Sequence, residues 1–157
     1  MTGLYVLLKL AHVAGACILL GTGIGIAFFL WMANRSGEAG FIATTARIVV
    51  IADAVFTATA VVAQPVTGVG LAGITGIPLS SPWIVLSLVL YGLVGACWLP
   101  VVWVQIKLRD LASAARDAGT PLPAQYHRLF RVWFILGWPA FAGVVAILAL
   151  MIAKPSF

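Results

Sequence analysis

The residues of this sequence that could do chemistry lie inside long apolar stretches. His12 follows Lys9 by three residues, so both lie on one face of a helix. A neutral imidazole is a common ligand of haem iron, and a lysine ammonium at the same level could pair with a haem propionate. A membrane histidine can also hydrogen-bond to a neighbouring helix. His12 therefore has two candidate roles, as a haem ligand or as a bond across the bundle.

Further polar residues fall at the depth of His12. A helix rises about 1.5 Å per residue, which places His12 roughly 12 Å along the first helix. The second apolar stretch returns toward that level, and the third starts from it. We therefore predict an outer cluster around His12. Its members are Lys9, His12, Gln64, Thr67, Ser87 and Tyr91.

A second group of polar residues lies toward the other side of the membrane. This inner cluster consists of Arg47, Asp53, Trp98, His127, Arg128 and Arg131. Charges near a helix end usually pair or extend to the interface, so we expect an ion pair between Asp53 and Arg131 or Arg47. We expect His127 at the interface. A site that uses both histidines is disfavoured, because they lie at opposite ends of the bundle.

Four membrane-spanning helices must position these residues. The 157-residue chain is 63% hydrophobic and 8% charged, whereas soluble domains carry roughly 25% charged residues. A spanning helix needs about 20 apolar residues, and the apolar stretches do not alternate as barrel strands would. We predict an all-α, single-domain four-helix bundle in the lipid bilayer. Its helices are expected near residues 4–33, 44–72, 82–109 and 124–153. The cytoplasmic loop at 110–123 is expected to begin as an amphipathic helical extension and to end at Thr-Pro-Leu-Pro.

Basic residues indicate the orientation of these helices. Arg35, Arg47 and the positive residues around the 110–123 loop lie at one end, and Lys9 and Lys154 lie at the other. Cytoplasmic loops carry the excess of Lys and Arg. We therefore expect a multi-pass protein of the cell inner membrane, with both termini on the outer side. No basic and aromatic pattern indicates nucleic acid binding.

Glycine, proline and cysteine add expectations about packing. Gly21 and Gly25 form a small-xxx-small pair, which favours close helix approach. Pro65 has no N–H to give to the carbonyl of Val61, so it is expected to kink its helix. The two cysteines, Cys17 and Cys97, are expected to be small apolar side chains rather than ligands or disulfide partners.

Short motifs along the chain suggest a family. Leu8-Lys9-Leu10-Ala11-His12 resembles the first helix of HemJ-type membrane proteins, and the segment from Tyr126 through Pro139 to Lys154-Pro155-Ser156-Phe157 is similar to their last helix. The chain looks closest to an uncharacterised branch grouped with HemJ-type and CopD-type proteins. HemJ-type proteins are haem-associated protoporphyrinogen oxidases, so the resemblance implies haem ligation by His12 with Lys9 as its companion.

The resemblance has two limits. Where the HemJ family has an Asn-Glu pair before the last proline, this chain has the run from Trp133 to Trp138, which does not match the oxidase pattern. CopD-type proteins would imply copper handling. Copper(I) sites favour clustered Met and Cys, whereas the methionines here are scattered at Met1, Met32 and Met151.

These features favour a haem b-binding membrane protein with a redox role, in electron transfer or HemJ-like oxidase chemistry. The first alternative is a transporter of a small solute, ion or proton, with Asp53 as its titrating group. The second is a non-enzymatic accessory subunit that packs on itself or on a membrane partner through its glycine face. Hydrolases are disfavoured, because the chain has no nucleophile elbow or His-Glu-x-x-His motif.

Overall fold

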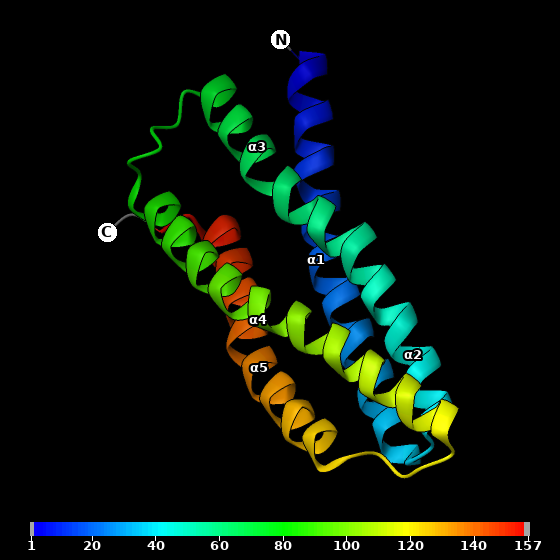
Figure 1. Cartoon of the computed structure of the whole chain (residues 1–157). Helices are drawn as coiled ribbons and strands as arrows, with labels where there is room; N and C mark the ends of the chain where they lie inside the picture. Colours follow the sequence, from blue (N-terminus) through cyan, green and yellow to red (C-terminus); the bar gives the residue numbers. More distant parts are fainter. Residues whose placement is uncertain (1, 156–157) are drawn as a thin grey trace.

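The computed structural model describes residues 2–155 and, for side-chain exposure, residues 3–155. The chain forms two helical hairpins, each made of two long helices (Figure 1). The first hairpin consists of α1 (Thr2–Ser36) and a second helix made of α2 (Ala39–Ala52), η1 (Asp53–Thr57) and α3 (Ala58–Thr75). The second hairpin consists of α4 (Pro82–Ala118) and α5 (Ala124–Ala153). Met1, Ser156 and Phe157 of the quoted motifs lie outside the described residues.

The expected all-helical fold is confirmed over the described residues. They hold four continuous helices long and apolar enough to cross a membrane and no strand: Gly3–Ser36, Ala39–Thr75, Pro82–Ala118 and Ala124–Ala153. At about 1.5 Å per residue, the longest of them spans about 55 Å, which exceeds the roughly 30 Å hydrocarbon core. Their ends therefore extend beyond the apolar layer.

The helices are longer than expected at the end that carries the arginines. The helical extension expected at the start of the 110–123 segment is present and reaches Ala118, because residues 110–118 are rich in Ala. Gly119 ends α4 in the left-handed region (φ 62°), and Pro121 and Pro123 follow it. Likewise, residues 37–38 alone separate α1 from α2, where Gly37 makes the turn with a φ of 70°.

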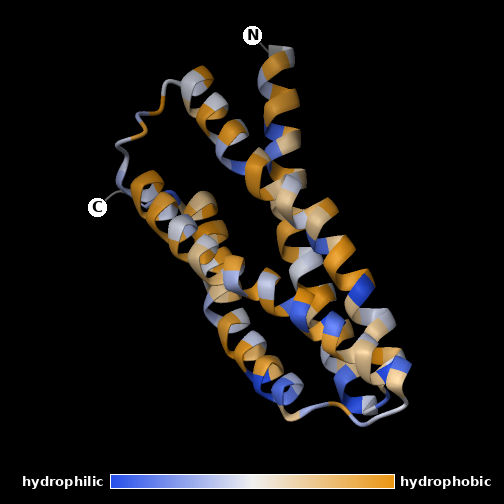
Figure 2. Ribbon diagram, viewed as in Figure 1, coloured by the Kyte–Doolittle hydropathy of each residue, from blue (hydrophilic) through white to orange (hydrophobic). Residues whose placement is uncertain are grey.

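The core lies toward this arginine end. Leu30, Ile42, Leu108 and Tyr126, one from each long helix, are fully buried there. Small side chains between them, such as Ala112, let α4 approach α2. Hydrophilic residues also gather toward this end (Figure 2).

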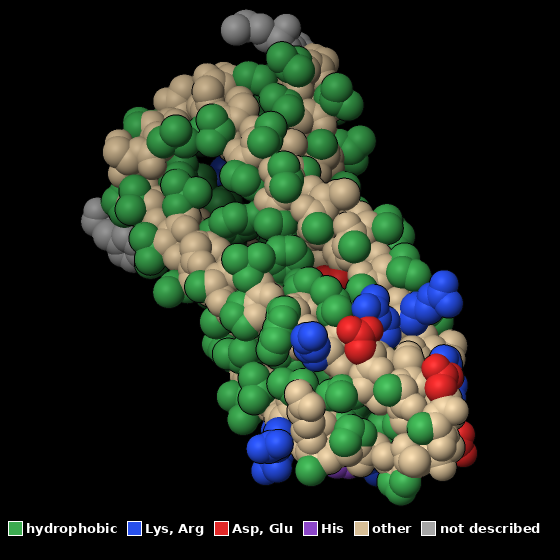
Figure 3. Space-filling model, viewed as in Figure 1, with side chains coloured by type: hydrophobic (Ala, Val, Ile, Leu, Met, Phe, Trp, Pro, Cys, Tyr) green, Lys and Arg blue, Asp and Glu red, His purple; other side chains and the backbone are tan. Residues whose placement is uncertain are grey.

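The two hairpins separate toward the other end, which carries both termini and the 76–81 loop. There α3 packs against α1, while α4 packs against α5 (Figure 1). The space-filling view is hollowed between α3 and α4 in this half (Figure 3). The termini thus lie at one end, as the basic residues predict, whereas the side of the membrane on which they lie stays a prediction.

The expected packing through Gly21 and Gly25 is wrong within this chain. A side-chain carbon added at either glycine would meet nothing within 4 Å. Close approach occurs instead at Gly15 and Gly143, where an added carbon would lie 2.4 Å from Gln64 Nε2 and from Val94 Cγ2, respectively. Spacing of small residues identified a helix face, but the face that meets a neighbour depends on how the whole bundle packs.

Substitution of Ala112 by leucine tests the packing of the α4 extension. Ala112 is fully buried, so the added atoms overpack the core and should lower the free energy of unfolding by about 1–3 kcal/mol. Ala114→Leu, two residues away on an exposed position, should change it by less than about 0.5 kcal/mol. The measurement is denaturant titration in detergent followed by circular dichroism. Equal effects of the two variants would contradict the packed extension.

Candidate functional site

Two polar sites lie inside the bundle, one in each half. The first joins α1 to α3 near the end that carries the termini, and it is centred on His12. The second joins η1, α4 and α5 nearer the arginine end, and it is centred on Asp53. Each site contains part of a cluster predicted from the sequence, but neither contains the whole of it.

His12 is half-buried and lies against α3. Its Nδ1 is 2.8 Å from the hydroxyl of Thr67. An added carbon at Gly68 would lie 3.2 Å from His12 Cε1, so the glycine lets the imidazole approach the α3 backbone. Gln64 Nε2 donates to the backbone carbonyl of His12 at 2.8 Å, and it lies over Gly15. Thr67 therefore fixes the ring of His12, and Gln64 fixes its backbone.

The hydrogen bonds around Thr67 favour one tautomer of the imidazole. The hydroxyl has one proton, and the carbonyl of Ala63 lies 2.7 Å away and accepts it. The hydroxyl oxygen then accepts from His12 Nδ1–H. The opposite tautomer would leave an N–H at Nε2, for which the described residues provide no acceptor. With the proton on Nδ1, the Nε2 lone pair remains free to bind a metal.

The other members of the outer cluster are not gathered around His12. Lys9 is exposed, and its Nζ lies 5.6 Å from the ring centroid of Tyr5. Ser87 is buried in α4, where its hydroxyl donates to the carbonyl of Trp83 in the same helix at 2.7 Å. The outer cluster therefore reduces to His12, Gln64 and Thr67, all on α1 and α3.

Tyr91 forms a bond between the two hairpins. Its hydroxyl donates to the carbonyl of Val61, the group that Pro65 leaves without its usual helical N–H donor. In lipid an unpaired carbonyl is costly, and neighbouring helices often supply the missing donor. Tyr91 thus has a structural partner rather than a position in the His12 site.

Asp53 has no arginine partner. The expected ion pair with Arg131 or Arg47 is absent: the ion pairs among the described residues are Arg109–Asp110 and Arg116–Asp117. Arg47 and Arg131 are exposed, because each lies on a helix face turned away from the bundle interior. The inner cluster of Arg47, Asp53 and Arg131 therefore separates into a buried carboxylate and two exposed cations. His127 is exposed at the arginine end, where an interfacial residue is expected.

The partners of Asp53 are N–H donors of α4 and α5. Trp98 Nε1 donates to Asp53 Oδ1 at 3.4 Å. The Gln105 amide, in the orientation that satisfies both its ends, donates to Asp53 Oδ2 at 3.1 Å and accepts from Trp133 Nε1 at 3.2 Å. Asp53 and Gln105 are only 4% and 2% exposed. A hydrogen-bonded chain therefore connects three long helices through the bundle interior.

The backbone at Asp53 is a π-helical turn. The N–H of Ala58 bonds to the carbonyl of Asp53, five residues back, in η1. Single π turns inside α-helices are frequent at functional sites and shift the residues that follow around the helix axis. Pro65 was expected to kink this helix; α3 continues through Pro65, and the π turn lies eight residues or more before it.

Trp133 is the member of this network that the sequence analysis missed. It was considered only as part of an apolar and aromatic run. The sequence did contain a signal for Trp133: it lies seven residues after Tyr126, on the same face of α5. Both side chains are buried in the structure. The connection of Gln105 to Asp53 was not expected from the sequence either.

Comparison with known proteins gives one result. A family model described as "Predicted integral membrane protein (DUF2269)" matches residues 6–155. No curated protein and no solved structure matches the chain. The resemblance to HemJ-type and CopD-type proteins thus stays a prediction.

A double-mutant cycle tests the bond between Tyr91 and Val61. Tyr91→Phe should lower the free energy of unfolding by about 0.5–1.5 kcal/mol, because the Val61 carbonyl loses its donor. In a Pro65→Ala background the alanine N–H supplies a donor, so the same substitution should cost less. Unfolding in detergent measures all four proteins. An equal cost in both backgrounds would show that Tyr91 does not compensate for the proline.

Proposed function

The chain belongs to this family of integral membrane proteins, and we propose that it binds haem b through His12 and has a redox role. The observation that carries the proposal is the hydrogen bond from His12 Nδ1 to Thr67, which leaves Nε2 with a free lone pair. Histidines that bind metals usually donate their other ring N–H to a fixed acceptor, which orients the ring. Thr67 and Gly68 together provide that orientation here.

The residues present suit haem better than a bare metal ion. Residues 3–155 contain no group of three or more His, Cys, Asp or Glu side chains that could hold an ion. A bare ion near His12 would therefore find a single strong protein ligand, whereas haem iron already has four porphyrin nitrogens. The hollow between α3 and α4 provides apolar space in the same half of the bundle (Figure 3). Bound haem would supply one-electron chemistry, and the chain would supply orientation and an apolar surrounding.

The roles of the other outer residues follow from their positions. Thr67 holds the ring, and Gln64 holds the backbone that carries it, so both are positioning residues. Lys9 lies three residues before His12 and has no carboxylate partner among the described residues, so it is available to a haem propionate. Protoporphyrinogen oxidation is not part of the proposal, because the run from Trp133 to Trp138 does not match the oxidase pattern.

The visible absorption spectrum tests the proposal. The protein is expressed with added haem precursor and purified, and a Soret band with a pyridine haemochrome of haem b is expected. His12→Ala should abolish the band. His127→Ala replaces the other histidine of the chain, which is exposed at the opposite end, and should keep it. Thr67→Val should weaken haem retention, since it removes the acceptor of Nδ1–H.

The outcome is decisive in either direction. A colourless wild-type protein from fully supplemented cells would contradict haem binding. Equal loss of colour in His12→Ala and His127→Ala would show that neither histidine is a specific ligand. If Thr67→Val bound haem as tightly as the wild type, the orienting role of the hydroxyl would be wrong while ligation by His12 would stand.

A second candidate function, proton-linked transport, is favoured by the isolation of Asp53. A carboxyl group that is buried at membrane depth without a cation is costly, and such groups often belong to ion or proton pathways. Its position at a π-helical turn adds to this, since such turns are frequent where a helix has a functional role. In this function Asp53 would take up and release the proton, and Trp98 and Gln105 would stabilise the ionised form.

Proton flux into vesicles tests this second candidate. Purified protein is reconstituted with a trapped pH-sensitive dye, and flux is driven by a potassium diffusion potential. Asp53→Asn keeps the shape of the side chain but cannot titrate, so flux should be lost. Asp110→Asn, at an exposed residue paired with Arg109, should keep it. No flux in the wild type, or equal flux in both variants, would contradict the role of Asp53.

A further inference from the structure

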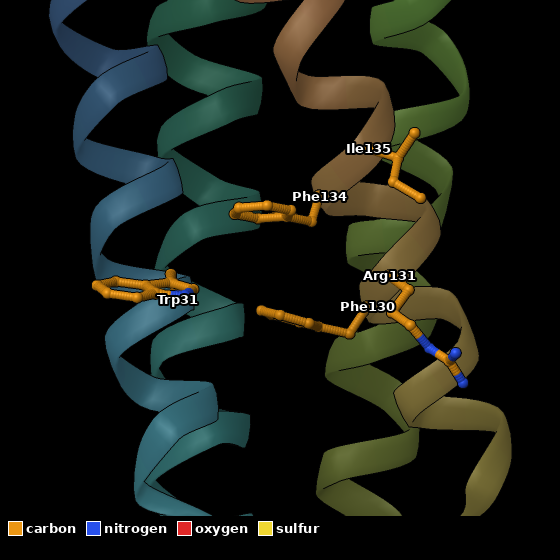
Figure 4. A pocket seen from close by; sticks show the side chains of 5 residues that line it. All are labelled: Trp31, Phe130, Arg131, Phe134 and Ile135. Carbon is orange, nitrogen blue, oxygen red and sulfur yellow. The ribbon is translucent and has the colours of Figure 1, made fainter.

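A shallow pocket opens on the lipid-facing surface between α1 and α5, near the arginine end. Its lining is Trp31 from α1 and Phe130, Arg131, Phe134 and Ile135 from α5 (Figure 4). The two phenylalanines point across the space between the helices toward Trp31, whereas Arg131 and Ile135 extend from the other side of α5 in this view (Figure 4). The pocket therefore combines an aromatic wall with a single cation.

The charges around the pocket are uncompensated cations. Arg131 takes part in neither of the ion pairs found among residues 3–155, both of which lie on α4. Arg35 lies one helical turn beyond Trp31, and its guanidinium carbon is 5.1 Å from the Trp31 ring centroid. Arg128, one turn before Arg131, is exposed as well. The pocket thus opens in a field of positive charge.

The depth of the pocket corresponds to the boundary between head groups and acyl chains. Arg131 lies seven residues after the start of α5, which is about 10 Å along the helix. Tryptophan and arginine are typical of this level in membrane proteins. Phe134 and Ile135 lie further from the arginine end, so they line the part of the pocket nearer the membrane centre (Figure 4).

We propose that this pocket is a binding site for an anionic phospholipid, such as phosphatidylglycerol. The phosphate lies at Arg131, whose planar guanidinium can donate two parallel hydrogen bonds to its oxygens. One acyl chain lies along Phe134 and Ile135, opposite Trp31. Basic pockets between transmembrane helices commonly bind anionic head groups on the side of the membrane where positive residues gather. The positive charge of the pocket and its apolar floor together select this class of lipid over a zwitterionic one.

The site has a structural consequence for the bundle. Over their whole lengths, α1 packs against α5 much less extensively than α4 does. A lipid in the pocket would fill the space between the hairpins and join them at the level of Trp31. The proposal is independent of haem at His12, which lies in the other half of the bundle.

Native mass spectrometry of the purified chain in detergent tests the proposal. Phosphatidylglycerol and phosphatidylcholine with the same acyl chains are added in equal amounts, and preferential retention of phosphatidylglycerol is expected. Arg131→Gln should reduce that retention roughly fivefold, the effect of one basic residue near an anionic lipid. Arg131→Lys keeps the charge without the two-pronged geometry and should have an intermediate effect.

Arg47→Gln is the matched control. It removes one exposed arginine at the same end of the bundle but from α2, outside the pocket, and should leave retention within about twofold of the wild type. Equal retention of the two lipids by the wild type would overturn the proposal. Equal loss in Arg47→Gln and Arg131→Gln would also overturn it, because attraction would then be diffuse. A dimer that is lost in Phe134→Ala, with no lipid preference, would show that a second copy occupies the pocket.

Discussion

The structure depends on one constraint: inside a bilayer, a polar group has no water to pair with and must find its partner in the protein. Each helix satisfies its own backbone, so the side chains and the broken backbone positions remain to be paired between helices. In this chain those pairings are few. They join α1 to α3 at His12, α3 to α4 at Val61, and η1 to α4 and α5 at Asp53.

These joints also explain why the bundle is asymmetric. The network of Asp53, Gln105 and Trp133 lies beside the tightly packed half, where small side chains bring the helices together. In the other half the helices pack within their own hairpins. Among the described residues, the Tyr91 hydroxyl links α4 to α3. The dense half holds a carboxylate that donors surround. The open half holds an imidazole whose Nε2 is free, and this division gives the two sites different chemistry.

Lipid is part of the same account. A soluble protein would hide the apolar surface that this chain exposes on every helix, whereas here the bilayer covers it. Where an exposed cation and an aromatic wall occur together on that surface, as at Arg131 and Trp31, the covering molecule is selected by its charge. The arginines that are absent from the interior of the bundle thus act at its surface.

The sequence by itself determined the helices, because a run of apolar residues that long has one stable form in lipid. It also identified the individual residues of interest, including His12, Asp53 and the carbonyl of Val61 that Pro65 leaves free. These groups can be identified from the sequence because their chemistry depends on residue type and local position, not on tertiary contacts. The extent of α4 to Ala118 was determined locally as well, by Gly119 and the two prolines that follow it.

Only the tertiary structure decided which of these residues meet. Ser87 and Lys9 share the depth of His12 but point to other partners, since depth along a helix does not fix rotation about it. The π turn at Asp53 rotates every later residue about the helix axis, and no residue type predicts such a turn. Asp53 therefore accepts hydrogen bonds from Trp98 and Gln105 in place of an arginine. The partner of each polar residue depends on how the four helices pack together. The spacing of residues along one helix does not carry that information.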